Sequence, residues 1–463
     1  MQMFDAIDKT AHVEIIDNPD VREFLSKCRY MVEPSGKEAK EVADLFVKYP
    51  LQQEKLPVNI ISIDGSSYEA SISDNLPHTR VGYVKVGNIL IKRDEYNDLG
   101  KQKYINPFLV AEMEKATSST VFALPSSNMQ YGGKESVRDG FRLALDNYLF
   151  KYRNNPSDIK TSLRTTLFKL ASYRTGSNCT DSDNELILHK CPNSKCNAKN
   201  ISVWNIDEEQ FCPECGETIY PSDCLRIWEE VEDNGSNQSA LTRFTNVIEH
   251  LFVMHYIRMI IDFSPESYVE TLSDICFFMD GPLAIYGNAA WVHNAIMKYL
   301  HEINVVMQKH NKNPILIIGL VKSGAIVDYF KMIEKDIKEE TILCLSDEVR
   351  NKYVNYDRKA SSSTFGSETY YGQDFIYKAK SGKLIVFNLP YPFESKGDIK
   401  SFILNKSDIK KYQNLNKSLC LLNEFECDLY ENTVVPVALA RKHTVISLKP
   451  GSQVLDLLTR LNA

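Results

Sequence analysis

Short runs of apolar residues alternate along this 463-residue chain with longer segments whose apolar positions recur every three or four residues. The short runs are typical of buried strands, and the longer segments are typical of helices. The predicted strands are residues 56–63, 81–91, 120–124, 275–279, 314–321, 375–377 and 384–388. The predicted helices are residues 134–152, 157–173, 240–262, 290–309 and 436–443.

Strands mixed with long helices indicate an α/β domain with a mixed sheet. Residues 1–55 carry two amphipathic segments and predict a small N-terminal helical segment. Residues 181–236 break the alternation with clustered cysteines, glycines and acidic residues, so we interpret them as an insertion. The main domain is therefore expected in two parts, at residues 56–180 and 237–463.

Composition is that of a globular protein, with 43% hydrophobic and 25% charged residues. No apolar run reaches the roughly 18 residues of a membrane span. Asp5 and Asp8 stand where a signal peptide would have its apolar core. We therefore expect a cytoplasmic protein without a membrane segment. The net charge of −7 argues against general attraction to nucleic acid but allows a local basic groove.

Four of the eleven cysteines cluster as CPNSKC and CPEC, which are Cys191, Cys196, Cys212 and Cys215. The fifteen residues between the two pairs are enough for a hairpin that brings them together. Four thiolates complete the tetrahedral shell of Zn²⁺ and leave no position for water, so we predict a structural zinc ribbon. The alternative is a degenerate ribbon held by packing alone. The insertion could serve DNA contact, dimerisation or partner docking.

Two aspartates share one context. Asp64 and Asp280 each follow an apolar run, where we expect a strand to end, and each precedes a glycine. If the two strands are neighbours, the carboxylates converge on a hard cation, as two-metal phosphodiester hydrolysis requires. The alternative is that each Asp-Gly pair only begins a turn.

Four short motifs in a fixed order resemble the NurA nuclease family. They are a first strand with DGS, a later strand with DGPL, a strand that runs into G-x-x-K-S, and a late P-x-x-L-x-x-x-H segment, at residues 64–66, 280–283, 319–323 and 436–443. The resemblance implies an RNase H-like fold and a DNA nuclease that depends on Mn²⁺ or Mg²⁺. It also implies a homodimer that works with a HerA-type hexameric ATPase.

Residue by residue, the resemblance implies that Asp64 is the central metal ligand and that Asp280 is a ligand on a later strand. It implies that His443 is a ligand or proton-transfer group near the second metal. Lys322 would neutralise charge on the scissile phosphate, although it could also be a solvated lysine after a strand. The chain departs from the family at Val435, where a tyrosine is common.

The family also has a glutamate on the helix before the strand that carries the second aspartate. Glu249 is the only glutamate of the predicted helix 240–262, and it lies among apolar residues, where an unpaired carboxylate is costly to bury. We therefore predict that Glu249 is the catalytic glutamate. Glu135, at the start of an earlier helix, is the rival, although its charge is also favourable at a helix N-terminus.

Two basic segments could contact DNA. Residues 151–174 contain six basic residues against one acid, and residues 394–417 contain six lysines against three acids. The first segment also carries aromatic side chains, which stack on unpaired bases in some DNA-binding proteins. The alternative is a solvated helix face with aromatic residues in the core.

The sequence therefore favours a DNA nuclease, either an exonuclease or a single-strand endonuclease, that processes DNA ends in repair or in defence against phage. The alternative is a catalytically inactive scaffold that binds DNA or an ATPase through its zinc ribbon. The chain has neither a G-x-x-x-x-G-K-[ST] nor a G-x-G-x-x-G motif at a strand–helix junction, so it carries no evident ATPase site of its own.

Overall fold

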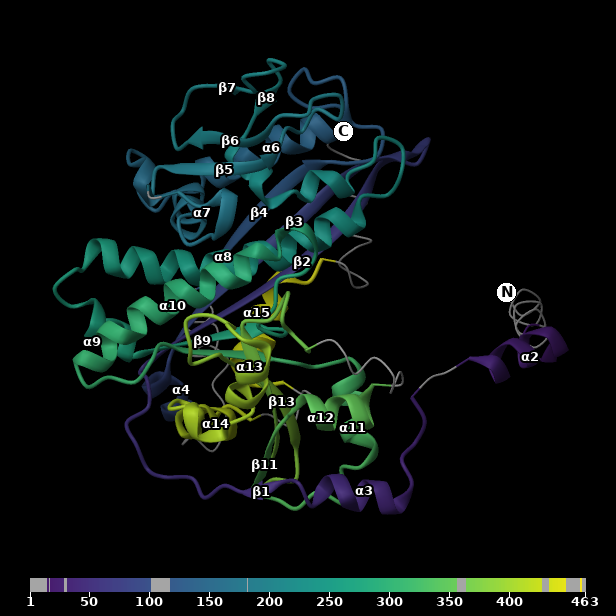
Figure 1. Ribbon diagram of the computed structural model, residues 1–463, viewed down its shortest axis with the longest axis vertical. Helices are drawn as coiled ribbons and strands as arrows, with labels where there is room; N and C mark the ends of the chain where they lie inside the picture. The colour runs from purple at the N-terminus through teal and green to yellow at the C-terminus, as the bar shows by residue number, and fades with distance from the viewer. Residues whose placement is uncertain are drawn as a thin grey trace.

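The computed structural model describes residues 17–28, 31–100, 117–180, 182–355, 364–426 and 433–446, together with Ile15 and Thr459. These residues form a nine-stranded sheet covered by helices on both faces (Figure 1). The strands are β1 (Val47–Lys48), β2 (Asn59–Ser73), β3 (Leu76–Lys92), β4 (Thr117–Pro125), β9 (Ile275–Asp280), β10 (Leu316–Leu320), β11 (Thr341–Cys344), β12 (Gly372–Lys378) and β13 (Leu384–Pro390).

The sheet has the strand order β1-β11-β12-β13-β10-β9-β2-β3-β4. Its centre is parallel, because β9 pairs in parallel with both β2 and β10. All other neighbouring strands are antiparallel. The predicted α/β fold with a mixed sheet is therefore confirmed. Among the described residues, no helix has the length and apolar character needed to span a membrane.

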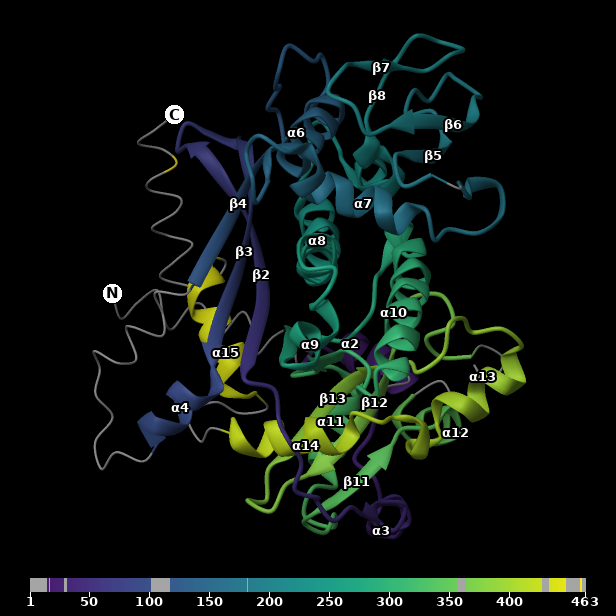
Figure 2. The same ribbon diagram turned by 90° about the vertical axis from the view of Figure 1, so that its left-hand side faces the viewer.

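Helices cover the two faces of this sheet. The helices are α2 (Pro19–Lys27), α3 (Gly36–Ala43), α4 (Arg93–Gly100), α6 (Val137–Lys151), α7 (Leu163–Ala171), α8 (Gln238–Phe263), α9 (Tyr268–Ser273), α10 (Trp291–Lys309), α11 (Ala325–Met332), α12 (Asp347–Val349), α13 (Ile399–Lys406), α14 (Leu415–Glu424) and α15 (Val435–Thr444). Helix α2 has no buried residue and stands apart from the sheet in Figure 1. Figure 2 shows β2 and β3 between α15 on one side and α8 on the other.

Side chains alternate between these two faces along each central strand. In β9, Cys276 and Phe278 belong to the core beneath α14 and α15, whereas Phe277 and Met279 belong to the core beneath α8 and α10. A third core lies between α3, α11 and the outer strands β11 to β13. The parity of β9 places the Asp280 side chain on the α15 face.

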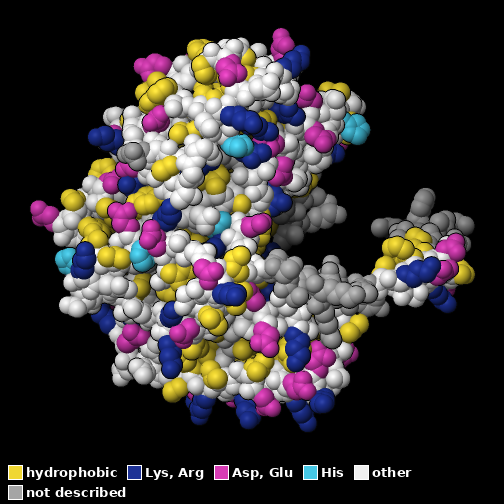
Figure 3. All heavy atoms as spheres, viewed as in Figure 1, with side chains coloured by type: hydrophobic (Ala, Val, Ile, Leu, Met, Phe, Trp, Pro, Cys, Tyr) yellow, Lys and Arg dark blue, Asp and Glu magenta, His cyan; other side chains and the backbone are white. Residues whose placement is uncertain are grey.

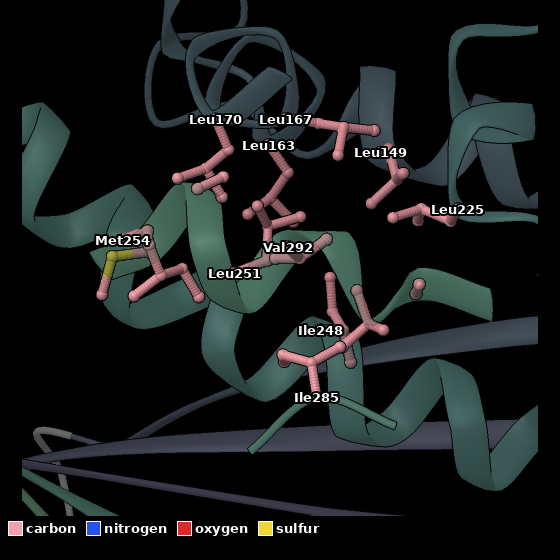
Figure 4. Close-up of a cluster of buried hydrophobic side chains, with 14 of the residues drawn as sticks. Leu149, Leu163, Leu167, Leu170, Leu225, Ile248, Leu251, Met254, Ile285 and Val292 are labelled. Atoms are coloured by element: carbon pink, nitrogen blue, oxygen red, sulfur yellow. The ribbon is translucent and has the colours of Figure 1, made fainter. Parts of the chain in front are cut away.

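Helix α8 is buried along most of its 26 residues. Its apolar side chains pack against α7 and α10, as Figure 4 shows for Ile248, Leu251, Met254, Leu163, Leu167, Leu170 and Val292. A helix held by apolar contacts on several sides has little freedom to rotate. This packing fixes the orientation of the polar residues that α8 presents to β2.

The insertion contains the short strands β5 (Glu185–Lys190), β6 (Lys199–Trp204), β7 (Gln210–Phe211) and β8 (Thr218–Ile219), which form two separate hairpins. Leu186, Leu188 and Val203 join the core that contains α7 and α8. The insertion is therefore packed on the main domain. The division of the chain at residues 55, 180 and 236 stays a prediction.

Two local expectations need correction. Asp64 does not end its strand, because β2 continues to Ser73 and pairs with β3 throughout this stretch, from Asp64↔Gly87 to Ser71↔Arg80. The N-terminal segment also contains a strand besides α2 and α3, since Val47 pairs with Ile342 of β11. The β1–β11 ladder joins segments distant in sequence, so the local pattern could not indicate it. Strands β2 and β3 form a hairpin, but the end of β2 consists of small polar residues without an apolar run.

Candidate active site and zinc ribbon

The strand register brings Asp64 and Asp280 together. The parallel ladder between β2 and β9 ends at the pair Ile63↔Met279, so the next residue on each strand is an aspartate. The two carboxyl groups are close enough to share a hydrogen bond. Strand β9 ends at Asp280, whereas β2 runs on, which opens the sheet beside Asp64. The two aspartates therefore lie at a notch in the middle of the sheet.

Asp64 is buried, and only 5% of its surface is exposed. Burial and, next, the negative charge of Asp280 raise the pKa of Asp64 to about 7. Two contacts oppose this rise: the Thr444 hydroxyl donates a hydrogen bond to Asp64 Oδ2, and the Lys322 ammonium lies nearby. The ionised form of Asp64 is therefore disfavoured in this environment, and a bound cation would stabilise it.

Glu249 reaches the same notch from the opposite face of the sheet. The Gly65 backbone N–H, which has no β9 partner, donates a hydrogen bond to the Glu249 carboxylate. A side chain at residue 65 would collide with this group, because an added Cβ would lie 2.8 Å from Glu249 Oε1. Burial and the charges of Asp64 and Asp280 raise the pKa of Glu249 well above its ordinary value.

Two cations accompany this acidic cluster of Asp64, Glu249 and Asp280. Lys322 Nζ lies 2.7 Å from Asp280 Oδ2, and the two side chains are each only 15% exposed. Arg441, on the last turn of α15, places a guanidinium nitrogen 3.9 Å from the same oxygen. Lys322 is therefore not a solvated lysine, because it forms a largely buried ion pair within the cluster.

His443 also belongs to the last turn of α15, next to Thr444. Its Nε2 atom is buried and has no hydrogen-bond partner among the described residues. Gly87, the β3 partner of Asp64, lies against this turn, with an added Cβ 2.6 Å from Thr444 Cγ2 and 3.9 Å from His443 Cβ. An unpaired buried ring nitrogen is expensive unless it meets a ligand or a proton-carrying group.

The structure therefore gathers four of the predicted residues, Asp64, Glu249, Asp280 and Lys322, and places His443 one residue from the Asp64 contact. Their carboxylate oxygens are donors that hard divalent cations prefer. Glu135 does not join them, since it is exposed and precedes the N-cap of α6. The geometry thus favours Glu249 over its rival.

Three further contacts were not predicted from the sequence. Thr444 and Arg441 belong to a segment singled out only for its histidine, and Gly65 was considered only in the alternative interpretation, in which the Asp-Gly pair begins a turn. Each contact depends on the packing of α15 or α8 against β2. The helical period could have suggested Thr444. Ala440, His443 and Thr444 share one face of α15, so a polar residue beside the predicted histidine lies on the same side of the helix.

The four predicted zinc ligands converge. Cys191 and Cys215 have their sulfurs 3.7 Å apart, and Cys196 and Cys212 have theirs 3.8 Å apart. All four sulfurs lie within 4.8 Å of one another. Tetrahedral Zn²⁺ with Zn–S bonds of about 2.3 Å separates its sulfurs by about 3.8 Å. The cluster therefore fits a closed, structural zinc site.

Among the described residues, the four cysteines are the group that already converges for a metal. In the acidic cluster, Lys322 lies against Asp280, and Glu249 accepts the Gly65 N–H. A divalent ion at this cluster would therefore have to compete with Lys322 for the Asp280 carboxylate.

The basic segment 151–174 is largely absorbed by packing. Arg164 is 4% exposed and pairs with Asp146, and Arg174 stacks on Trp291. Phe168 is fully buried. In the segment 394–417, Lys396 and Lys406 are also held by internal hydrogen bonds. The alternative interpretation, a solvated helix face with aromatic residues in the core, therefore holds for the core position of Phe168 but not for Arg164 and Arg174, which make internal contacts.

Comparisons with known proteins agree with the resemblance found in the sequence. The family model of the NurA domain matches residues 58–434, which is more than half of the chain. The crystal structure of the NurA nuclease from Sulfolobus solfataricus is a weak geometric likeness, with 10% identity, a TM-score of 0.31, and coverage of 99% of this chain and 95% of that chain. No curated protein matches the chain. Because the family model covers residues 58–434, which include β2, α8 and β9, the chain belongs to the NurA domain family.

Proposed function

We propose that this protein is a metal-dependent nuclease that hydrolyses phosphodiester bonds in DNA, as an exonuclease or a single-strand endonuclease. The observation that carries the proposal is the meeting of three carboxylates from β2, α8 and β9 at one notch of the sheet. Such a cluster is strained without a cation, and the pKa values of Asp64 and Glu249 are both raised for this reason. Membership of the NurA domain family supports the same reading.

In this proposal, Asp64, Glu249 and Asp280 hold two Mn²⁺ or Mg²⁺ ions, and His443 Nε2 is a further ligand or carries a proton. When bound, the two ions activate a water molecule and stabilise the leaving oxygen. Thr444 keeps Asp64 oriented and charged through its hydrogen bond. Lys322, which pairs with Asp280 in this structure, would be free to neutralise charge on the scissile phosphate when the Asp280 carboxylate holds a metal ion.

Cleavage by three single-residue variants tests this assignment. D64A and E249Q should each lose at least a hundredfold in the cleavage rate of single-stranded and linear double-stranded DNA with Mn²⁺, because each removes a negatively charged carboxylate ligand. E135Q is the matched control and should cleave like the wild type. Full activity of D64A, or loss in E135Q but not in E249Q, would refute the assignment.

The same assay distinguishes the nuclease from the alternative, a catalytically inactive scaffold. Wild-type protein that binds DNA but cleaves none with either Mn²⁺ or Mg²⁺ would be such a scaffold. The retention of three converging carboxylates and a paired lysine favours the enzyme, since burying such charges without use costs stability.

The proposed partners follow from the family. We propose that the protein forms a homodimer and works with a HerA-type hexameric ATPase, which would feed DNA to the notch during end processing or phage defence. Mixing the protein with a HerA-type hexameric ATPase from the same organism should give a stable complex on size-exclusion chromatography. ATP should then increase the cleavage of linear duplex DNA.

A further inference from the structure

A pocket lies between β10 and β13, at the end of β10 that is remote from the notch. The ladder between these two strands consists of two pairs, Gly319↔Asn388 and Leu320↔Phe387. Strand β13 continues to Pro390, but a proline has no N–H to donate to a neighbouring strand. The strands therefore separate here, and the opening between them has a volume of about 360 Å³. We call it the β10–β13 pocket, and its volume is typical of small-molecule sites.

The β10–β13 pocket is separate from the notch. Its lining includes Leu316 at the start of β10, whereas Leu320 at the end of this strand pairs with Asp280. Each strand residue advances by about 3.3 Å, so about 13 Å separate the two leucines. Helix α10 and residues 389–393 and 410–414 supply most of the other walls. None of the described lining residues belongs to the site proposed for cleavage, so a ligand here would be independent of the metal ions at the notch.

The charged side chains of the β10–β13 pocket are basic. His301, Lys410 and Lys411 line it, and none of the described lining residues is acidic. Lys411 Nζ donates a hydrogen bond to the amide oxygen of Asn405 rather than to a carboxylate. On the face shown in Figure 3, by contrast, Lys and Arg side chains are interspersed with Asp and Glu side chains. A group of basic side chains without an acidic neighbour attracts an anion, and phosphate is an anion that lysine commonly binds.

Aromatic rings form another part of the wall. Phe393 is half-buried and lies parallel to Tyr391, with ring centroids 5.3 Å apart and 11° between the ring planes. Phe402 packs against Phe393 edge to face, with centroids 5.9 Å apart, so the Phe393 ring is held by two neighbours. A flat ring in a fixed orientation is a surface on which a nucleobase can stack.

Two amide side chains complete the lining. Gln308 and Gln413 are exposed at the pocket, and an amide carries both hydrogen-bond donors and an acceptor. The edge of a nucleobase carries the complementary groups. An inorganic anion would make no use of the ring, and an apolar ligand would make no use of the lysines.

We propose that the β10–β13 pocket binds a nucleoside phosphate, with the base against Phe393 and the phosphate at Lys410 and Lys411. The volume of the pocket suits one small molecule rather than a strand of DNA. A 5′-mononucleotide and a nucleoside triphosphate share this chemistry. The site goes beyond the proposed nuclease function and does not depend on it.

Calorimetric titration of the zinc-loaded full chain, without Mn²⁺ or Mg²⁺, tests this site with dAMP, ATP, inorganic phosphate and oligothymidylate. One or both nucleotides should bind, and the tighter of the two identifies the source of the ligand. Inorganic phosphate should bind about tenfold more weakly than that nucleotide, because it has no base to stack. The proposal is overturned if neither nucleotide binds at millimolar concentration, if phosphate binds as tightly as the nucleotides, or if oligothymidylate alone binds.

Variants of the pocket locate the binding. K410Q/K411Q should weaken nucleotide binding at least tenfold, because it removes both charges near the phosphate. F393L keeps an apolar side chain but removes the ring, so it should weaken nucleotide binding about tenfold and leave phosphate binding unchanged. K335Q/K338Q is the matched control, since both lysines are exposed and lie outside the pocket. Circular dichroism and zinc content report that each variant is folded, and wild-type nucleotide binding in K410Q/K411Q or F393L would contradict the proposal.

D64N separates this site from the notch. It should bind nucleotides like the wild type, because Asp64 does not line the β10–β13 pocket. Nucleotide binding that is lost in D64N and kept in K410Q/K411Q would place the ligand at the notch and overturn the proposal. A failure of the proposed cleavage activity would leave these binding results unchanged.

Discussion

Asp64 is the central residue of the proposed site, and its surroundings explain both what the sequence indicated and what it did not. The apolar run before Asp64 correctly indicated a buried strand. The glycine after it suggested a turn, but Gly65 is needed because the Glu249 carboxylate lies against its backbone. A glycine that makes room for a neighbour and a glycine that makes a turn look the same in a sequence.

The raised pKa of Asp64 predicts a pH-dependent stability of the metal-free protein. The Asp64 carboxyl group binds its proton more tightly in the folded state than in the unfolded chain. Protonation of Asp64 therefore adds to the free energy of unfolding, and this contribution is complete below about pH 4 and is lost as the pH rises through about 7. D64N cannot ionise. In EDTA it should be more stable than the wild type by about 1–3 kcal/mol at pH 8, and by progressively less as the pH falls toward 4.

Urea unfolding at several pH values measures this difference. D336N is the control, because Asp336 is exposed, and its stability should follow the wild type at every pH. A D64N variant that is less stable than the wild type at pH 8 would show that the Asp64 anion is not strained.

Gly65 provides a second test at the residue scale. In G65A, the new Cβ would lie 2.7 Å from Thr245 Cγ2 and 2.8 Å from Glu249 Oε1, so both side chains must move. The cleavage rate should fall at least tenfold while the protein stays folded, because a displaced ligand weakens metal activation. G36A is the control, since no atom lies within 4 Å of a Cβ at that position. Equal activity of G65A and the wild type would contradict the placement of Glu249.

At the scale of elements, segments with a clear apolar run or a helical period were predicted well, and strands without an extended apolar run were missed. The expected helix 240–262 corresponds to α8 at Gln238–Phe263, since its apolar run is long and continuous. Strand β11 was not predicted, because its four residues lie within a charged stretch. The extension of β2 beyond Asp64 was also missed. Its residues are mostly small and polar, and their strand conformation is stabilised by pairing with β3.

The zinc ribbon should unfold as a unit when its metal is lost. C212S/C215S removes two of four ligands, so zinc should be absent and amide hydrogens of residues 185–219 should exchange faster. Strands β2, β9 and β10 should keep their protection, because their ladders do not involve the ribbon. Unchanged exchange in a zinc-free ribbon would show that packing alone holds it.

At the scale of the whole molecule, the site exists only because distant segments meet in the sheet. Strands β2 and β9 pair in parallel, and α8 and α15 approach from opposite faces. Local patterns identified the aspartates but could not fix which strands are neighbours. The order of the four motifs indicated the family and thereby the partners of Asp64, whereas Thr444 and Arg441 depended on packing that no motif encodes.

Calorimetric titration of Mn²⁺ tests the central claim most directly, because it measures whether the notch binds divalent ions. The protein for this titration carries zinc in its ribbon and has no divalent ion at the notch. The wild type should bind Mn²⁺ and release protons at pH 7, since Asp64 is partly protonated there. D64N and D280N should each bind at least tenfold more weakly, and E135Q should bind like the wild type. Wild-type affinity in both D64N and D280N would contradict the account.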